Sequence, residues 1–386
     1  MSIIRYDELT WPEVGRLPRW LPLVIPLGLR PYQLDVVARS LRASDIGLLP
    51  PIPYGFPQPD GGGVAGLEVG RGVFRRVLRG VVSRLAGQGF ERVVFLDGHG
   101  LARRWGFNGM GLRSARFSEP GELTNGGGDW PEDIAERVAI MSTGHTEQHG
   151  HHLPLSTDTL IVEAISKGIV ERAPDRVLCL PVWPYGVSTH TDEFPGTLNL
   201  GGRVFEDFFL AIVGKLVQLG ARRILFSNGH GGNHSFLVNV VKFAGERWPQ
   251  AFVATEWLHT TGPSLARHRQ SPLGGMGHGC ELETSYVLHL RPDLVHMDRA
   301  TTEMDFISTP DYSMDWIESG RLIANPPWSD DTSSGIYGDA TVATASKGKL
   351  WLEAAIGEKI ALIDQVSEQY QRRMARRSER ASGLAS

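Results

Sequence analysis

The sequence predicts an α/β protein built from two copies of one parallel-sheet unit. Three observations lead to this prediction. Short apolar runs rich in β-branched residues alternate with amphipathic helical runs, two long segments resemble each other, and Gly-rich turns follow the apolar runs. A helix that joins two parallel strands covers one face of their sheet, so repeated βαβ units predict a mostly parallel sheet with helices on both faces.

The two copies align without a gap. LLPPIPYGF and VFRRVLRGVVSRLAGQGFERVVFLDGHG match CLPVWPYGV and VFEDFFLAIVGKLVQLGARRILFSNGHG. Tyr54 pairs with Tyr185, and His99 pairs with His230, at a constant offset of 131 residues (230 minus 99). Similarity over a segment this long indicates a duplicated domain rather than a short structural repeat.

Each copy predicts the same elements in the same order. A short apolar run ending in PYG comes first, followed by a helix over 73–89 or 204–220 and a strand over 93–97 or 223–228. Ligands bind beyond the carboxyl ends of parallel strands, and GHG and NGHGGN both follow a predicted strand there. Further along, ELETSYVLHL predicts a helix, and a long amphipathic helix is expected from about 346 to 376.

The copies differ where a site would lie. The second copy carries HTEQHGHHLPLST between Gly144 and Asp158, whereas the first carries only LRPYQL between Gly28 and Asp35. We therefore interpret residues 1–120 as a degenerate domain that lacks the metal-ligand loop, and residues 121–386 as the functional domain. PGELTNGGGDWP is the expected linker. One site per chain is predicted, and whether Asp35 or His99 reaches it stays open.

Composition excludes several classes of function. The chain has 386 residues, 41% apolar residues and a formal net charge of −4, which does not suit a general nucleic-acid or membrane-surface binder. No apolar stretch is long enough to span a membrane, and no signal segment opens the sequence. Two cysteines, Cys179 and Cys280, do not make a disulfide framework, so a reducing cytoplasm is expected.

The segment TEQHGHHLP is the strongest candidate for a metal site. Glu147 and His149 are two residues apart, so in extended backbone their side chains point the same way. Asp158 opens a helical run and has two oxygens with which to bridge two cations. The alternative is that Asp158 only caps the helix and the histidines are solvated.

Two later motifs add candidates. NGHGGN places His230 after a strand, and GHGCELETS contributes His278 with Glu281 and Glu283. His278 is a candidate general acid or base because the ordinary pKa of imidazole lies near neutrality, and either glutamate is a candidate metal ligand. The alternative is that the glutamates only favour a helix N-terminus. Carboxylate and imidazole ligands without cysteine suit Zn, Mn or Fe in a catalytic site with one or two ions.

These segments carry a family resemblance. TGHTEQHGHHLPLSTDT, YGVSTHTDEFPGTLNL, SNGHGGN and GHGCELETS resemble, in this order, motifs of the creatininase (creatinine amidohydrolase) family, over about residues 130 to 370. The resemblance implies a three-layer α/β/α sandwich, a metal-dependent hydrolase and a hexamer or trimer of dimers. It also implies four metal ligands, with the aspartate bridging, and a catalytic His278. The implied ligands are Glu147, His149, Asp158 and His230.

One departure from the family pattern bears on the ligands. Creatininase itself has a glutamate two residues after the motif histidine, and this chain has Gly232 there. This makes creatinine a doubtful substrate and shifts the expected fifth ligand to Glu283. The family also includes deformylases, a peptide-processing enzyme and a keto-inositol hydrolase, so the resemblance does not fix the substrate.

Several residues are predicted to face the substrate. The loop PYGVSTHTDEFPGT supplies three of them, with packing inside the loop as the alternative. The NGHGGN turn supplies an amide and two glycines that let the backbone approach a ligand closely. Trp257 and His259, after the strand FVATEW, are possible pocket walls. The predicted substrate-binding residues are Tyr185, Ser188, His190, Asn228, Gly231, Gly232 and Trp257.

The sequence thus predicts a metal-dependent amidohydrolase that acts on a small polar substrate, with a metal-activated water attacking a carbonyl and His278 moving the proton. One alternative is a C–C hydrolase of a cyclic sugar-like ketone with the same metal site, and another is an inactive scaffold. The first copy is expected to stand in for a partner subunit, so a homo-oligomer such as a dimer or trimer is favoured over a hexamer.

Overall fold

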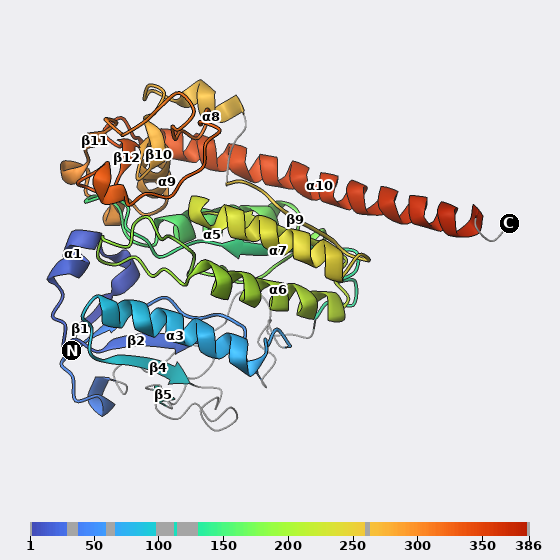
Figure 1. Cartoon of the computed structure of the whole chain (residues 1–386), viewed down its shortest axis with the longest axis horizontal. Helices are drawn as coiled ribbons and strands as arrows, with labels where there is room; N and C mark the ends of the chain where they lie inside the picture. The colour runs from blue at the N-terminus through green and yellow to red at the C-terminus, as the bar shows by residue number, and fades with distance from the viewer. Residues whose placement is uncertain are drawn as a thin grey trace.

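The chain contains two parallel sheets stacked with helices between them. The computed structural model describes residues 2–28, 38–58, 66–97, 112–113, 130–258 and 263–383. Asp35, His99, His259 and most of the predicted linker lie outside these ranges. Figure 1 shows the N-terminal sheet at the bottom, a layer of helices above it, the second sheet next and a long C-terminal helix on top.

The N-terminal sheet has the strand order β1-β3-β2-β4-β5, and each pair is parallel. Helix α3 follows β3 and returns the chain to β4, as a parallel connection requires. The short helix α1 lies beside the second half of the chain. The bounds are β1 Ser2–Arg5, α1 Trp11–Arg16, β2 Leu23–Leu27, β3 Asp45–Leu48, α3 Arg71–Gly87, β4 Val93–Asp97 and β5 Leu112–Arg113.

The second sheet has the order β7-β6-β8-β9 and is also parallel throughout. Successive side chains along its strands point to opposite faces of the sheet, and each face packs into a separate apolar core. Ala139 and Met141 of β6 pack with the helices toward the N-terminal half, whereas Val138 and Ile140 pack under α5, α9 and α10. The bounds are β6 Val138–Thr143, α5 Thr157–Arg172, β7 Val177–Cys179, α6 Gly202–Gln218, β8 Arg223–Asn228, α7 His234–Arg247 and β9 Phe252–Thr255.

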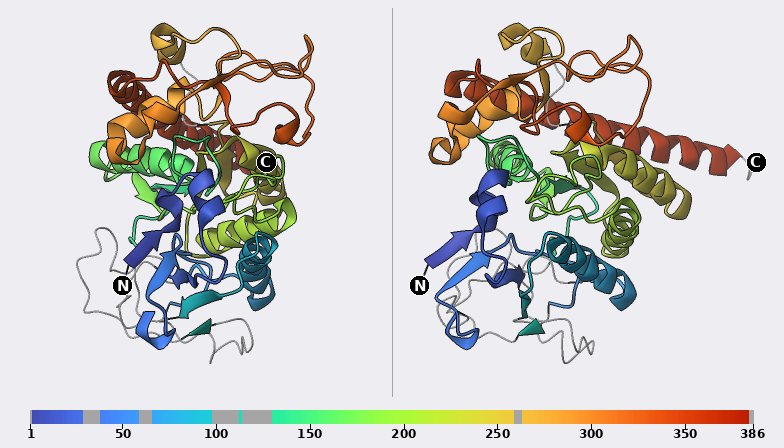
Figure 2. Two further views of the ribbon diagram at one scale, coloured as in Figure 1. Left: turned by 90° about the vertical axis from the view of Figure 1, so that its left-hand side faces the viewer. Right: turned by 60° about the vertical axis from the view of Figure 1, so that its left-hand side comes forward.

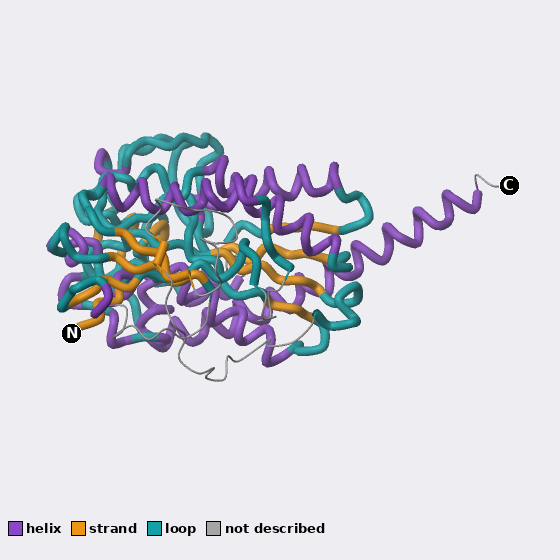
Figure 3. Tube along the Cα trace, turned by 90° about the horizontal axis from the view of Figure 1, so that it is seen from below, coloured by secondary structure: helices purple, strands orange, loops and turns teal. Residues whose placement is uncertain are grey.

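The C-terminal part completes the outer helical layer and adds a small antiparallel sheet of order β10-β12-β11. Helix α10 extends beyond the body of the molecule, as Figures 1 and 3 show. The second half is therefore the three-layer α/β/α sandwich that the sequence predicts. The bounds are α8 Pro263–His268, β10 Met276–His278, α9 Glu281–Leu290, β11 Thr302–Glu303, β12 Tyr337–Asp339 and α10 Ala345–Gly383.

The two halves share one strand order at their centres, β3-β2-β4 in the first and β7-β6-β8 in the second. Helix α3 begins at Arg71 and α6 begins at Gly202, so both the helices and the sequence repeat are offset by 131 residues. These matches support the interpretation that the two halves arose by duplication. The duplication and the domain boundaries both stay predictions.

Helices α3 and α6 pack against each other between the sheets (Figure 2). Tyr54 of the first half stacks on Phe208 of α6 with ring centroids 6.1 Å apart, and both rings are fully buried. At the edge of this contact Arg76 and Asp207, which occupy equivalent positions in the two helices, form an ion pair of 2.7 Å. One continuous apolar core thus joins both halves.

The predicted helices and strands agree with the structure to within a few residues. The helix expected over 346–376 is observed as the longer α10, and the helix expected in ELETSYVLHL is α9. No helix in the described part of the chain is long and apolar enough to cross a membrane.

Candidate metal centre

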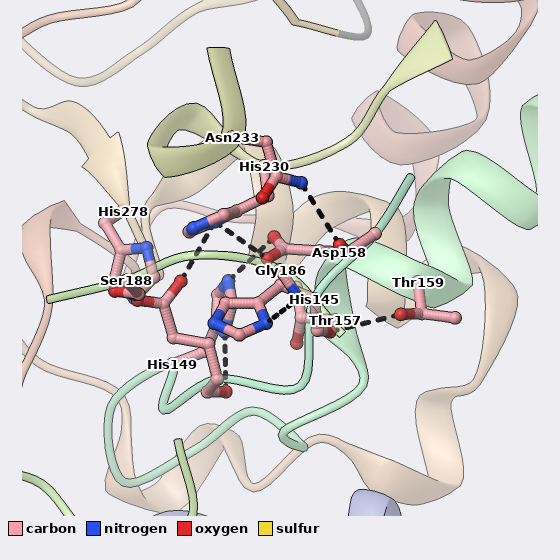
Figure 4. A network of polar contacts seen from close by, with 12 residues as sticks. His145, His149, Thr157, Asp158, Thr159, Gly186, Ser188, His230, Asn233 and His278 are labelled. Atoms are coloured by element: carbon pink, nitrogen blue, oxygen red, sulfur yellow. Dashed lines mark hydrogen bonds and ion pairs between the residues drawn. The ribbon is translucent and has the colours of Figure 1, made fainter. Parts of the chain in front are cut away.

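The candidate ligands meet at the carboxyl ends of β6 and β8. Glu147 and His149 lie in the loop that leaves β6, and Asp158 is in the first turn of α5. His230 lies in the GHG turn that follows β8, and Glu283 is in the first turn of α9. Each side chain is at most 4% exposed. The structure therefore brings all five sequence-predicted metal ligands into one buried cluster, of which Figure 4 labels His149, Asp158 and His230.

Glu147, Asp158 and His230 form one end of this cluster. His230 Nδ1 is 3.0 Å from a Glu147 oxygen and 3.1 Å from Asp158 Oδ2. His230 Nε2 is 3.0 Å from the Val187 carbonyl, so Nε2 carries the ring hydrogen and Nδ1 offers a lone pair. Glu147 Oε2 and Asp158 Oδ2 have no hydrogen-bond donor other than a protonated His230 Nδ1. Three lone-pair atoms facing one another in a buried space are suited to enclose a cation.

His149, Asp158 and Glu283 form the other end. His149 Nε2 lies 3.1 Å from Asp158 Oδ1 and 3.9 Å from Glu283 Oε1. His149 Nδ1 donates to the Glu147 carbonyl at 3.0 Å, which fixes the tautomer that leaves Nε2 free. Asp158 thus presents one oxygen to each end, as the predicted bridging role requires. The backbone N–H of Gly279 donates to the other Glu283 oxygen at 2.5 Å.

The buried carboxylates of the cluster make positive charge favourable there. Burial opposes protonation of His149, but Asp158 and Glu283 outweigh it and raise the pKa of His149 to about 9. Burial and the nearby Asp158 raise the pKa of Glu283 to about 7. Although burial acts against them, Glu147 and Asp158 also raise the pKa of His230 well above its usual value. Without a metal, protons compensate the three buried carboxylates, so the donor set fits a divalent cation.

His278 lies beside this cluster. Its ring centroid is 4.1 Å from that of His149, and its Nε2 donates to the Gln148 carbonyl at 2.7 Å. Nδ1 is then the nitrogen with the lone pair. Burial lowers the pKa of His278 to about 3, so the neutral ring is the stable form. This neutral ring can accept a proton from a group bound at the centre.

The loop after β7 supports Glu147 rather than forming an open substrate wall. Ser188 and Thr191 both donate hydrogen bonds to Glu147 Oε1, the latter at 2.8 Å, and both residues are fully buried. His190 is the more accessible member, with its Nε2 3.9 Å from Glu147 and its ring 4.3 Å from that of Trp328. Ser188 therefore orients a ligand, and His190 stays a candidate for substrate contact.

The NGHGGN turn has a close-packed backbone. Asn228 accepts a hydrogen bond from the His230 N–H at 3.2 Å and donates to the Trp257 carbonyl at 2.7 Å, so its amide organises the turn. A Cβ at Gly232 would lie 2.2 Å from the Val187 carbonyl and 2.5 Å from His230 Nε2. No side chain fits at Gly232 in this backbone, and the bond between His230 and Val187 depends on that glycine. Gly231 has more space, with Trp257 3.9 Å away.

Tyr185 does not reach the centre, contrary to the substrate-binding prediction. Its hydroxyl donates to the Pro50 carbonyl at 2.5 Å, and its ring is fully buried in the core between the halves. The motif PYG repeats in both copies because it builds that core. Trp257 is 46% exposed and packs edge-on against His234 with ring centroids 4.6 Å apart, so it remains a candidate wall.

Sequence reasoning missed some residues and left others open. His145 is fully buried, and one of its ring nitrogens lies within 4.8 Å of ligand atoms of Glu147 and His230. The alternation that links Glu147 and His149 extends back to His145 and is a signal that could have identified it. Glu281 lies outside the centre, because it binds Lys347 and the backbone N–H of Ser271.

Comparison with known proteins gives a consistent result. The family model described as Creatininase: Creatinine amidohydrolase matches residues 130–363. The chain is 29% identical over 271 residues to creatinine amidohydrolase of Pseudomonas putida, covering 65% of this chain and 96% of the relative. It is 34% identical over 219 residues to the mycofactocin precursor peptide peptidase of Mycolicibacterium smegmatis, covering 55% and 78%. It is 25% identical over 251 residues to 3-dehydro-scyllo-inosose hydrolase of Thermotoga maritima, covering 60% and 78%.

Solved structures agree with these sequence matches. A structure described as creatininase Mn aligns with a TM-score of 0.51 and 27% identity, over 61% of this chain and 91% of the other. A creatininase mutant described as Zn-Zn type aligns with a TM-score of 0.50 and 28% identity over the same shares. The family model's range, residues 130–363, contains the whole candidate centre.

Proposed function

The chain belongs to the creatininase family, and from that premise we propose that it hydrolyses a C–N bond next to the carbonyl of a small polar substrate. The observation that carries this proposal is the complete set of five buried carboxylate and imidazole groups at the carboxyl ends of the sheet. Relatives named as an amidohydrolase and a peptidase act on C–N bonds, which supports the same reaction class here.

A divalent metal is the proposed cofactor. Glu147, Asp158 and His230 would hold one ion, and His149, Asp158 and Glu283 a second. The relatives described as Mn and Zn-Zn types support zinc or manganese, and we propose zinc first because nitrogen and oxygen donors with fixed imidazole tautomers suit it. A bound ion would polarise a carbonyl and make water more acidic.

The protein groups then divide the remaining work. Ser188 and Thr191 orient Glu147 by hydrogen bonds to its outer oxygen. The Nδ1 lone pair of His278 takes a proton during attack on the carbonyl and returns it to the departing nitrogen. The Gln148 carbonyl holds His278 in the tautomer that this transfer needs. The proposed catalytic residue is therefore His278, as the sequence predicts.

A second candidate reaction is cleavage of a C–C bond in a cyclic polyol ketone. The observation that favours it is the 25% identity with 3-dehydro-scyllo-inosose hydrolase over 60% of this chain. The inactive-scaffold interpretation has less support, because every proposed ligand is present and oriented.

The test is a substrate screen with zinc-loaded protein. Formamides, lactams and short peptides represent C–N substrates, and cyclic polyol ketones represent the second candidate. We expect hydrolysis in the first group only, and a roughly 10²–10⁴-fold lower kcat in His278→Gln with unchanged zinc content. Turnover confined to the ketones would replace the proposal, and no turnover of either class with full zinc would favour a scaffold.

The N-terminal half is proposed to act as an internal partner subunit. Leu9 and Asp7 accept backbone hydrogen bonds from Leu155 and Ser156, in the loop that carries the ligands, at 2.9 Å each. Support of this kind from within the chain favours a dimer or trimer over a hexamer. Light scattering on the full chain tests the assembly, and a stable hexamer would contradict this part of the proposal.

A further inference from the structure

His145 differs from the other imidazoles at the centre in the kind of backbone group that its ring contacts. His149, His230 and His278 each place one ring nitrogen 2.7–3.0 Å from a backbone carbonyl. A carbonyl only accepts, so that nitrogen carries the hydrogen, and the other nitrogen is the one that offers a lone pair when the ring is neutral. This pattern is the one expected of metal ligands and proton acceptors.

The contact of His145 is reversed. Its Nδ1 lies 2.8 Å from the backbone N–H of Gly186, shown as a dashed line in Figure 4. A backbone N–H only donates, so Nδ1 must be the acceptor and the ring hydrogen must be on Nε2. The same contact excludes a doubly protonated ring, because a second hydrogen on Nδ1 would face the Gly186 hydrogen. His145 therefore presents a donor where its neighbours present lone pairs.

The Gly186 contact belongs to a rigid backbone segment. Val187 N–H donates to Asn233 Oδ1 at 3.0 Å, and the Val187 carbonyl faces His230 Nε2 at 3.0 Å. A Cβ at Gly186 would lie 2.9 Å from His145 Cγ and 2.6 Å from Asn233 Oδ1, so the backbone and the ring are closely packed. The segment 186–187 therefore fixes the hydrogen of both rings on Nε2, with a donor N–H facing His145 and an acceptor carbonyl facing His230, and the two ring centroids are 4.6 Å apart.

The Nε2 atom of His145 has no hydrogen-bond partner although the residue is fully buried. Buried donors are almost always paired, and an unpaired one costs free energy. One nitrogen of the ring lies within 4.8 Å of ligand atoms of Glu147 and His230, and Nδ1 is already engaged by Gly186. Nε2–H is thus a fixed donor without an acceptor, on a ring that lies beside the Glu147–His230 end of the proposed metal centre.

We propose that His145 binds an oxygen of the substrate through Nε2–H, at the Glu147–His230 end of the centre, and is not a metal ligand. The acceptor class is an oxyanion or a carbonyl oxygen that gains negative charge during hydrolysis. A preorganised donor at such a position stabilises the developing charge without needing to reorganise. This inference rests on the proposed function, because it assigns the group that the same site would use to hold its substrate.

The test uses zinc-loaded full-length protein and inorganic phosphate as an oxyanion probe. Zinc per chain is measured by elemental analysis, and the Kd for phosphate by calorimetry, in wild type, His145→Ala and His145→Gln. We expect wild-type zinc in both variants and a roughly tenfold to hundredfold weaker Kd in His145→Ala, with partial recovery in His145→Gln, whose amide can donate. The matched control is His152→Ala, because His152 is buried in the same loop but pairs with Thr284.

Two results would overturn the inference. Loss of zinc in His145→Ala would make His145 a ligand, and an unchanged Kd for phosphate with full zinc would remove its role as a donor. Absence of zinc from wild type would instead contradict the metal centre itself. Should the alanine variant fail to fold, ¹⁵N NMR of histidine-labelled wild type decides. A protonated Nε2 in His145 is expected, and a deprotonated Nε2 would contradict the inference.

Discussion

The two halves of this chain have the same central strand order but differ in what lies beyond the carboxyl ends of the strands. In the second half, the loop after β6 carries Glu147 and His149 to α5, and β10 and α9 add His278 and Glu283. The first half has a short segment at the equivalent place and one histidine, His99, among the 13 in the chain. The apolar pattern that builds a sheet is thus separable from the polar loop that builds a site.

The difference also shows what the first half contributes. Its core is continuous with that of the second half through α3 and α6, and its backbone binds the ligand loop. A region whose sequence lacks the ligand loop can therefore support the candidate site of the other region. Substitutions at the candidate site in the second half should lower metal binding and activity, and substitutions at the shared core should lower the free energy of unfolding.

The largest effect is expected from Asp158→Asn. Asp158 offers one oxygen to each end of the centre, so its loss should abolish binding of both ions and reduce kcat/KM on the order of 10³-fold or more. Elemental analysis and kinetics measure both effects. Retention of two ions per chain would show that the aspartate does not bridge.

A matched pair on α9 separates metal binding from stability. Glu283→Gln should lose the ion at the His149 end and keep the fold. Glu281→Gln should keep both ions but leave Lys347 buried without its partner, lowering the free energy of unfolding by about 3 kcal/mol. Metal content and chemical denaturation of both variants test the pair. Loss of an ion in Glu281→Gln, with both ions kept in Glu283→Gln, would show that Glu281 and not Glu283 is the ligand.

Metal affinity should depend on pH. In the metal-free chain, Asp158 and Glu283 outweigh the opposing effect of burial and raise the pKa of His149 to about 9. Burial, with a contribution from Asp158, raises the pKa of Glu283 to about 7. A metal at the His149–Glu283 end must displace these protons, so the apparent metal affinity of that end should rise as pH increases from below 7 to 9 and level off above 9. The expected slope between pH 7 and 9 is about tenfold per unit for one proton. Calorimetric titrations at several pH values measure it, and a flat profile would contradict the proposed protonation states.

A smaller effect is expected at the shared core. Gly55 has φ +104°, and a Cβ there would lie 2.6 Å from Phe208 of the other half. Gly55→Ala should therefore destabilise the fold by about 1–3 kcal/mol while leaving the metal content unchanged. Gly70→Ala is the control, since no heavy atom lies within 4 Å of its Cβ position. Separate thermal transitions for the two halves would show that the core does not couple them.

The smallest effect is expected from the ion pair between equivalent helices. The side chains of Arg76 and Asp207 are 47% and 56% exposed, so solvent screens their attraction. Arg76→Ala or Asp207→Ala should change the free energy of unfolding by about 0–1 kcal/mol. A double-mutant cycle by denaturation measures the coupling free energy between the two side chains. A value above about 1 kcal/mol would show that this ion pair stabilises the interface more than an exposed pair should.

The fold and the clustering of the five candidate ligands could be predicted because they depend on local patterns and ordered motifs. Apolar periodicity fixed the helices, and the spacing of Glu147 and His149 indicated that both point one way. Tyr185 could not be placed, because the same PYG motif serves the core in both copies and its hydroxyl bonds to the distant Pro50. The roles of Ser188 and His145 depend on which atoms they meet after folding, and a sequence does not contain those contacts.

The central claim is that one half of the chain holds a two-ion centre and the other holds none. Anomalous diffraction from crystals of the zinc-loaded protein tests it most directly. The account predicts two peaks per chain, one among Glu147, Asp158 and His230 and one among His149, Asp158 and Glu283, with none in the N-terminal half. Peaks at the ends of β2 or β4, or none beside Asp158, would contradict it.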